Sequence, residues 1–95
     1  MTVDEALARL REELESAGVP TEDRDVWYLT KEPFLSLAPG LVVFVGVRRG
    51  VRWPMKNGQW QELPLDRLSE AAALIAPLYP ERMSGVERAP QAAPV

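Results

Sequence analysis

The sequence predicts an α+β fold in which an antiparallel β-meander of three to five strands is packed on one face by an N-terminal and a C-terminal helix, a two-layer sandwich. Three observations predict it. Apolar residues recur at helical spacing at both ends of the first 80 residues, and β-branched and aromatic runs of strand length fill the middle. Short turns with glycine or proline separate these runs. No internal boundary interrupts the pattern, so we expect a single domain over residues 1–80.

The first predicted helix covers residues 3–17. Thr2 and Glu5 form a capping box, in which the threonine hydroxyl accepts the N–H of Glu5 and the glutamate side chain reaches back to the cap residue. Gly18 suits a left-handed residue after the helix, and Pro20 prevents the helix from resuming. The buried stripe has spacings of four, three and four residues: Val3, Leu7, Leu10 and Leu14.

Three stretches of strand character follow. Residues 26–30, VWYLT, are aromatic and β-branched between polar flanks and predict a strand. Residues 34–40, FLSLAPG, fit either a short edge strand or an irregular segment closed by its Pro-Gly turn. Residues 41–48 are almost continuously apolar, which is typical of a strand buried on both faces.

The register of the next hairpin decides which side chains are buried. Arg49 and Gly50 predict a two-residue reversal that pairs Arg48 with Val51. Cross-strand partners share a face, so the helices would cover one set of large side chains: Phe44, Trp53, Met55 and, after a second turn at Asn57-Gly58, Trp60. The opposite face would carry Val43, Val45 and Val47 beside Arg52, Pro54 and Lys56.

After a last short strand at about residues 59–62, helical spacing returns beyond Pro64. The stripe has spacings of three, four, three and four residues: Leu65, Leu68, Ala72, Ile75 and Tyr79. Pro77 is incompatible with the interior of a straight helix, so we expect regular helix to stop near Ala76 or to kink there. Residues 81–95 are small, polar and proline-rich without a period, and we expect a mobile extension there.

Composition argues against most catalytic chemistry. The chain has no cysteine, which excludes disulfides, iron–sulfur clusters and thiol catalysis. It has no histidine, so zinc sites and histidine general bases lose their usual residues. No glycine-rich nucleotide loop or serine-nucleophile motif is visible. We therefore expect a non-catalytic protein without a cofactor.

Two polar clusters are candidates for a metal site or a catalytic site. The acids of the TEDRD segment (Glu22, Asp23 and Asp25) are too few for calcium and lack the glycine bend of a calcium loop. Tyr28 and the Lys31-Glu32 pair could be combined as an acid and a base, but nothing in the sequence fixes their geometry. We expect no metal site and no catalytic residue.

The N-terminus predicts no export signal, because it is a charged helical pattern without an apolar core region. The longest apolar run, residues 41–47, has the length of a strand and is far below the ~18 residues that span a membrane. We expect a cytoplasmic protein without a membrane partner.

Charge is unevenly distributed along the chain. Residues 1–25 carry a net charge of −5, residues 26–61 carry +4, and residues 62–95 carry −2. The basic middle contains Arg48, Arg49, Arg52 and Lys56 near two tryptophans, a combination that can hold phosphates and stack bases. Nucleic-acid binding through this hairpin is therefore the alternative function.

The order of a helix, three strands and a helix is similar in outline to the double-stranded-RNA-binding domain. The likeness is one of topology alone, because the second helix begins PLDRLSEAAAL where that domain carries a lysine cluster. We assign no family on this basis. The acidic overall charge and the predicted burial of the tryptophans also weigh against nucleic acid.

The uncovered valine face is the preferred functional surface. An apolar stripe of this kind is rarely exposed on a monomer, and a basic rim would suit acidic side chains of a partner. We therefore expect a protein-interaction module that forms a homodimer. The alternative is that residues 34–39 or the C-terminal extension fold over the stripe. The candidate surface comprises Val43, Val45, Val47, Arg48, Arg49, Arg52, Pro54 and Lys56.

Overall fold

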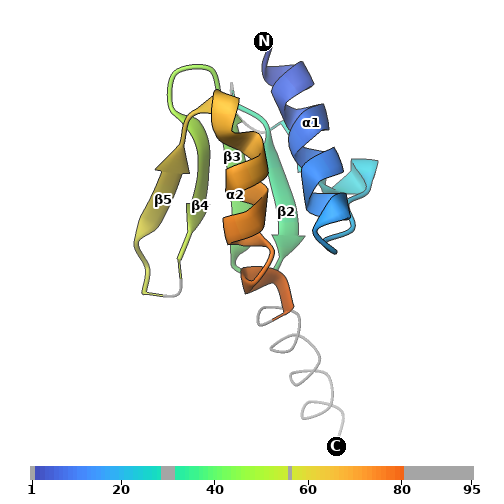
Figure 1. The fold of residues 1–95 in the computed structure, drawn as a ribbon, viewed down its shortest axis with the longest axis vertical. Helices are drawn as coiled ribbons and strands as arrows, with labels where there is room; N and C mark the ends of the chain where they lie inside the picture. Colours follow the sequence, from blue (N-terminus) through green and yellow to red (C-terminus); the bar gives the residue numbers. More distant parts are fainter. Residues whose placement is uncertain (1, 29–31, 56, 81–95) are drawn as a thin grey trace, which may run out of the picture.

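The computed structural model describes residues 2–28, 32–55 and 57–80, and it confirms the predicted α+β sandwich. Five antiparallel strands form one meander sheet in the order β1-β2-β3-β4-β5, and both helices lie over the same side of it (Figure 1). The expected mobile extension, residues 81–95, lies outside the described residues. The elements are α1 (Val3–Ser16), β1 (Val26–Trp27), β2 (Phe34–Ala38), β3 (Leu41–Gly46), β4 (Gly50–Pro54), β5 (Trp60–Leu63) and α2 (Leu68–Ile75).

The predicted N-terminal helix is present and ends one residue early, at Ser16. The Glu5 N–H donates to Thr2 Oγ1 at 3.1 Å, and the Thr2 hydroxyl donates to the Glu5 carboxylate at 3.2 Å. Gly18 follows the helix with φ +93°, a conformation that glycine adopts without a steric penalty. Three of the four residues of the predicted stripe are buried together with Ala6, namely Leu7, Leu10 and Leu14, whereas Val3 is only partly buried.

The C-terminal helix begins with a 3₁₀ turn over Leu65–Arg67 before α2 starts. Regular helix stops at Ile75, close to the predicted end, because Pro77 has no N–H to continue the helical ladder. Its buried face packs against α1 and against β4. The residues of this face are Leu68, Ala71, Ala72 and Ile75.

The ambiguous segment FLSLAPG contains a true strand, β2, which lies between β1 and β3 rather than at the sheet edge. Leu35 of β2 is fully buried. The predicted strand over residues 26–30 is β1, of which only Val26–Trp27 form regular pairs; residues 29 and 30 lie outside the described residues.

The predicted register of the β3–β4 hairpin is wrong. Phe44 lies opposite Arg52, and Gly46 lies opposite Gly50, so the loop has three residues, 47–49, instead of two. Gly50 has φ +74°, the left-handed conformation that follows the turn in three-residue hairpin loops. The longer loop displaces the register by an odd number of residues, which exchanges the two faces of β3 relative to β4.

This exchange corrects the predicted burial. Val43 and Val45 are fully buried on the face that the helices cover, whereas Phe44 lies on the other face. The assignment of β4 is unaffected: Trp53 is fully buried and Arg52 points to the opposite side. The valine stripe of β3 is therefore core, because Trp53 and the helices pack over the same side of the sheet.

The second hairpin also differs from the prediction by one residue. Trp60 pairs with Pro54 rather than with Met55, and the Met55 N–H donates to the Gln59 carbonyl at 2.7 Å. Gly58 has φ +84° in this turn. Trp60 consequently lies on the face away from the helices, so its predicted burial is wrong.

We expect Gly50→Ala to destabilise the fold more than Gly58→Ala. Both glycines are left-handed, so each substitution should cost about 1–2 kcal/mol in backbone strain. A Cβ at position 50 would also collide with the Leu63 carbonyl, whereas nothing lies within 4 Å of one at position 58. Urea unfolding measures the difference, which should exceed about 1 kcal/mol. Equal losses would contradict the close approach of β5 to Gly50.

The register itself predicts a contrast between two valines. Val45 is fully buried and Val47 is 66% exposed. Val45→Ala should therefore lower the free energy of unfolding by about 2 kcal/mol, and Val47→Ala should change it by less than about 0.5 kcal/mol. The two-residue register would instead leave both valines on the uncovered face, and both substitutions would then have small effects.

Candidate interaction surface

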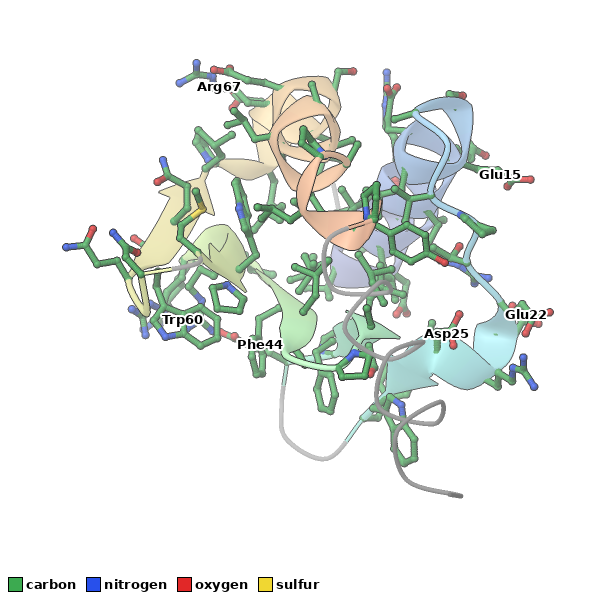
Figure 2. All side chains as sticks on the ribbon, turned by 90° about the horizontal axis from the view of Figure 1, so that it is seen from below. Glu15, Glu22, Asp25, Phe44, Trp60 and Arg67 are labelled. Atoms are coloured by element: carbon green, nitrogen blue, oxygen red, sulfur yellow. The ribbon has the colours of Figure 1, made fainter. Side chains whose placement is uncertain are left out.

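The sheet has one face against the helices and one face turned away from them. We call the second one the open face, because no described helix packs on it. Figure 2 shows Phe44 and Trp60 on this side, with both helices on the other. The fold thus presents side chains from all five strands on a single surface.

Four aromatic side chains cross the open face, and we call them the aromatic row: Trp27, Phe34, Phe44 and Trp60. Trp27 lies opposite Phe34, and Phe34 lies opposite Phe44, so these three share the face by strand pairing. The rings of Phe34 and Phe44 have centroids 5.3 Å apart, and those of Phe44 and Trp60 are 5.8 Å apart. The row therefore extends from β1 at one edge to β5 at the other.

The aromatic row is incompletely buried within the described chain. Trp27 is 47% exposed and Trp60 is 53% exposed, while the two phenylalanines between them are half-buried. Single exposed apolar residues are common on protein surfaces, but contiguous apolar patches mark binding sites. Tryptophan is also among the residues that contribute most to protein interfaces.

Charged groups at the loop end of the open face are paired with one another. The Arg52 Nη2 donates to Glu32 Oε2 at 2.6 Å, and the guanidinium lies 5.2 Å from the centre of the Phe44 ring. The Glu32 carboxylate lies above Gly46, where a Cβ would stand 2.5 Å from it. Arg49 pairs with Glu62 at 3.3 Å. Arg49 and Arg52 are thus each paired with a carboxylate of the same chain.

The predicted contact residues separate into four groups. Val43 and Val45 belong to the core and are unavailable for contacts. Arg52 and Pro54 lie on the open face, because both are on the side of β4 that faces Phe44 and Trp60. Lys56 lies outside the described residues. The other three form the exposed loop between β3 and β4: Val47, Arg48 and Arg49.

Sequence reasoning missed the aromatic row. Its members are visible as aromatic residues in four strand-like stretches, but their common face depends on the length of both hairpin loops. Each loop is longer than the assumed two-residue turn, and each change moves one strand's aromatic residue from the helix side to the open face.

The clusters weighed as metal or catalytic sites are used in internal contacts. Asp25 accepts the Glu22 N–H at 2.9 Å, and Asp23 pairs with Arg11 at 3.0 Å. Glu32 is held against Arg52, and Lys31 lies outside the described residues. Over residues 2–28, 32–55 and 57–80, no group of three or more metal-binding side chains converges.

None of the described helices is both long enough and apolar enough to cross a bilayer. Comparisons with protein-family models, with curated proteins and with solved structures find no significant match.

We expect the Arg52–Glu32 pair to contribute more than a fully exposed pair. Arg52 is mostly buried and stacks on Phe44, which limits the entropy that the pair loses. A double-mutant cycle with Arg52→Gln and Glu32→Gln, measured by urea unfolding, should give a coupling of about 1 kcal/mol. The same cycle on the exposed Arg67–Glu70 pair is the control and should give less than about 0.5 kcal/mol. Equal coupling energies for the two pairs would contradict the conclusion that burial and stacking on Phe44 fix the position of Arg52.

Proposed function

We propose that this protein is a non-catalytic protein-interaction module that self-associates through its open face. The observation that carries the proposal is the aromatic row, which spans the sheet and leaves two tryptophans about half exposed. The contact surface is centred on this row and includes Arg52 and Pro54 of the surface expected from the sequence. The aromatic row takes the place of the buried Val43 and Val45 as the apolar part of the expected contact surface.

Burial of the row supplies the driving force for association. Each aromatic side chain can bury on the order of 150–250 Å² in a core or an interface, and apolar area contributes roughly 25 cal/mol per Å² removed from water. Trp27 and Trp60 still expose about half of their surface, so a partner can remove it from water without rearranging the sheet. A flat, rigid strand surface also loses little conformational entropy on binding.

The charges support a second copy as the partner. Arg52 and Arg49 are paired with carboxylates of the same chain, which lowers the positive charge that these two side chains present to a second copy. Two such faces can approach without strong repulsion. A two-fold axis would place the same apolar patch of each copy against the other, the arrangement of most homodimers.

The same pairing weighs against the alternative, an accessory protein that binds nucleic-acid phosphates through residues 48–56. Exposed tryptophans on an antiparallel sheet favour base stacking. However, Glu32 and Glu62 lie beside the arginines that would contact phosphates, and these carboxylates would repel the nucleic-acid backbone. The observations favour a protein partner.

We expect Trp27→Ser and Trp60→Ser each to weaken self-association at least tenfold, because tryptophans that an interface buries often contribute about 2 kcal/mol or more. Light scattering and sedimentation over a concentration series measure the dissociation constant. Leu74→Ser is the matched control, since Leu74 is 47% exposed on α2, away from the open face. It should leave the dissociation constant unchanged.

Fluorescence provides a second measurement on the unmodified chain. Trp53 is fully buried, so acrylamide quenching reports mainly on Trp27 and Trp60. Quenching should fall as protein concentration rises through the association range. A protein that stays monomeric at high concentration would refute self-association. Salt-sensitive binding of single-stranded oligonucleotides that is lost in Trp60→Ser would instead support the alternative.

A further inference from the structure

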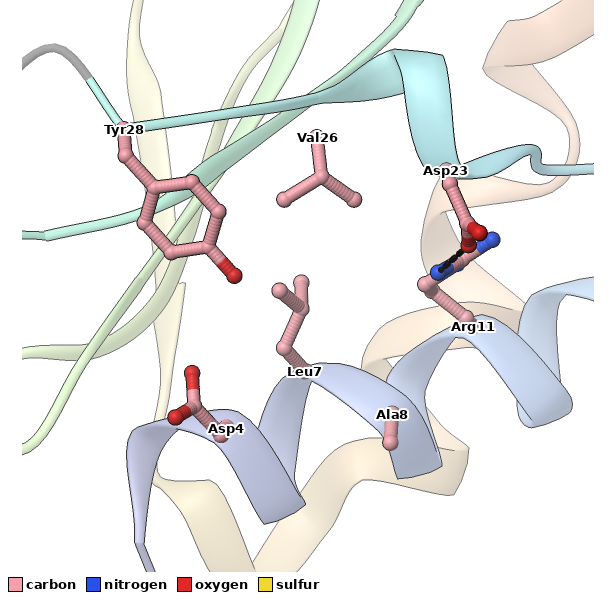
Figure 3. Close-up of a pocket in the computed structure, with 7 residues that line it drawn as sticks. All are labelled: Asp4, Leu7, Ala8, Arg11, Asp23, Val26 and Tyr28. Carbon is pink, nitrogen blue, oxygen red and sulfur yellow. Dashed lines mark hydrogen bonds and ion pairs between the residues drawn. The ribbon is translucent and has the colours of Figure 1, made fainter.

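A hollow lies on the helix side of the sheet, between α1 and β1, and we call it the α1–β1 groove. It has a volume of about 370 Å³ (Figure 3). Its floor is apolar, because Leu7 is buried and Val26 is half-buried beside it. The remaining lining residues are Asp4, Ala8, Arg11, Asp23 and Tyr28.

One end of the groove is closed by an arginine whose hydrogen-bonding groups are engaged within the chain. Arg11 Nε donates to Thr21 Oγ1 at 3.0 Å, and its Nη1 donates to Asp23 Oδ1 at 3.0 Å. The Arg11 side chain is only 25% exposed. It therefore serves as a wall that ties α1 to the following segment, and it is poorly placed to receive an anionic ligand.

The other end carries an uncompensated negative charge. Among the described residues, Asp4 has no ion-pair partner. Figure 3 shows the Asp4 carboxylate and the Tyr28 hydroxyl directed toward the same end of the groove. Counting the ion pair as neutral, the lining has a charge of about −1, within a segment, residues 1–25, that carries −5. The local field therefore attracts cations.

These features define the chemistry of an occupant. It needs an aliphatic stem for the floor and a cationic head for Asp4, which together describe a lysine or arginine side chain. A planar guanidinium can meet the carboxylate with two hydrogen bonds and stack on the Tyr28 ring, whereas an ammonium offers only a point charge. The tyrosine therefore favours arginine.

We propose that the α1–β1 groove binds an arginine side chain of a partner protein, with its stem on Leu7 and Val26 and its guanidinium between Asp4 and Tyr28. This site is separate from the open face, since Val26 points to the helix side and its neighbour Trp27 to the opposite side. It would provide a contact with a carboxylate, whereas the accessible groups of the proposed self-association surface are mainly aromatic.

The test uses the full chain and a single-residue probe. N-acetyl-arginine amide is titrated into ¹⁵N-labelled protein at constant ionic strength, and N-acetyl-citrulline amide, which has nearly the same shape without the charge, is titrated in parallel. We expect saturable shifts of backbone amides in residues 4–11 and 23–28 with the arginine probe alone. The amide of Trp60 should not respond, which separates this site from the proposed function.

Variants assign the binding to the proposed groups. Asp4→Asn should lower the affinity for the arginine probe about three- to fivefold, the loss expected for one solvent-accessible ion pair. Asp66→Asn, at another exposed aspartate near a helix start, is the matched control and should have no effect. Tyr28→Leu keeps the apolar wall and should also weaken binding. Equal binding of the citrulline probe, unchanged binding to Asp4→Asn, or shifts located elsewhere would overturn the proposal.

Discussion

The turn at Gly50 is the constraint on which the two surfaces of the sheet depend. Its left-handed backbone allows a three-residue loop, and the absence of a Cβ allows the Leu63 carbonyl of β5 to come close. The loop length then fixes which side of β3 faces the helices. Val43 and Val45 fill the core because of this choice, and Phe44 reaches Arg52 on the open face for the same reason.

The two faces of the sheet differ in what covers their side chains. The helix side is closed by leucines from α1 and small residues from α2, which let the helices pack closely over Trp53. On the open face Arg52 pairs with Glu32 through Nη2 and stacks on Phe44, while its buried Nε has no hydrogen-bond partner. What it leaves accessible is aromatic surface, which gains free energy when a partner covers it.

The strand β1 separates the proposed contact surfaces. Side chains alternate along a strand, so Val26 contributes to the floor of the α1–β1 groove while Trp27 begins the aromatic row. One surface is centred on aromatic side chains, and the other combines an apolar floor with Asp4, a carboxylate that has no ion-pair partner among the described residues. A partner that engaged both could obtain affinity from the first and selectivity for a basic residue from the second.

The sequence by itself determined the fold class, both helices, most of their buried residues and the approximate positions of β1, β3, β4 and β5, because these depend on local periodicity, capping residues and turn residues. It left open whether residues 34–39 form a strand. It also placed Trp53 inside and Arg52 outside, since their alternation within β4 is local. Only the tertiary structure decided which sides of β3 and β5 share a face with them. A hairpin loop that differs by one residue inverts a whole strand, and similar turn residues permit either length. The choice comes from packing across the sheet, where the core valines and the approach of Leu63 to Gly50 select one register, and the aromatic row on the open face is its consequence.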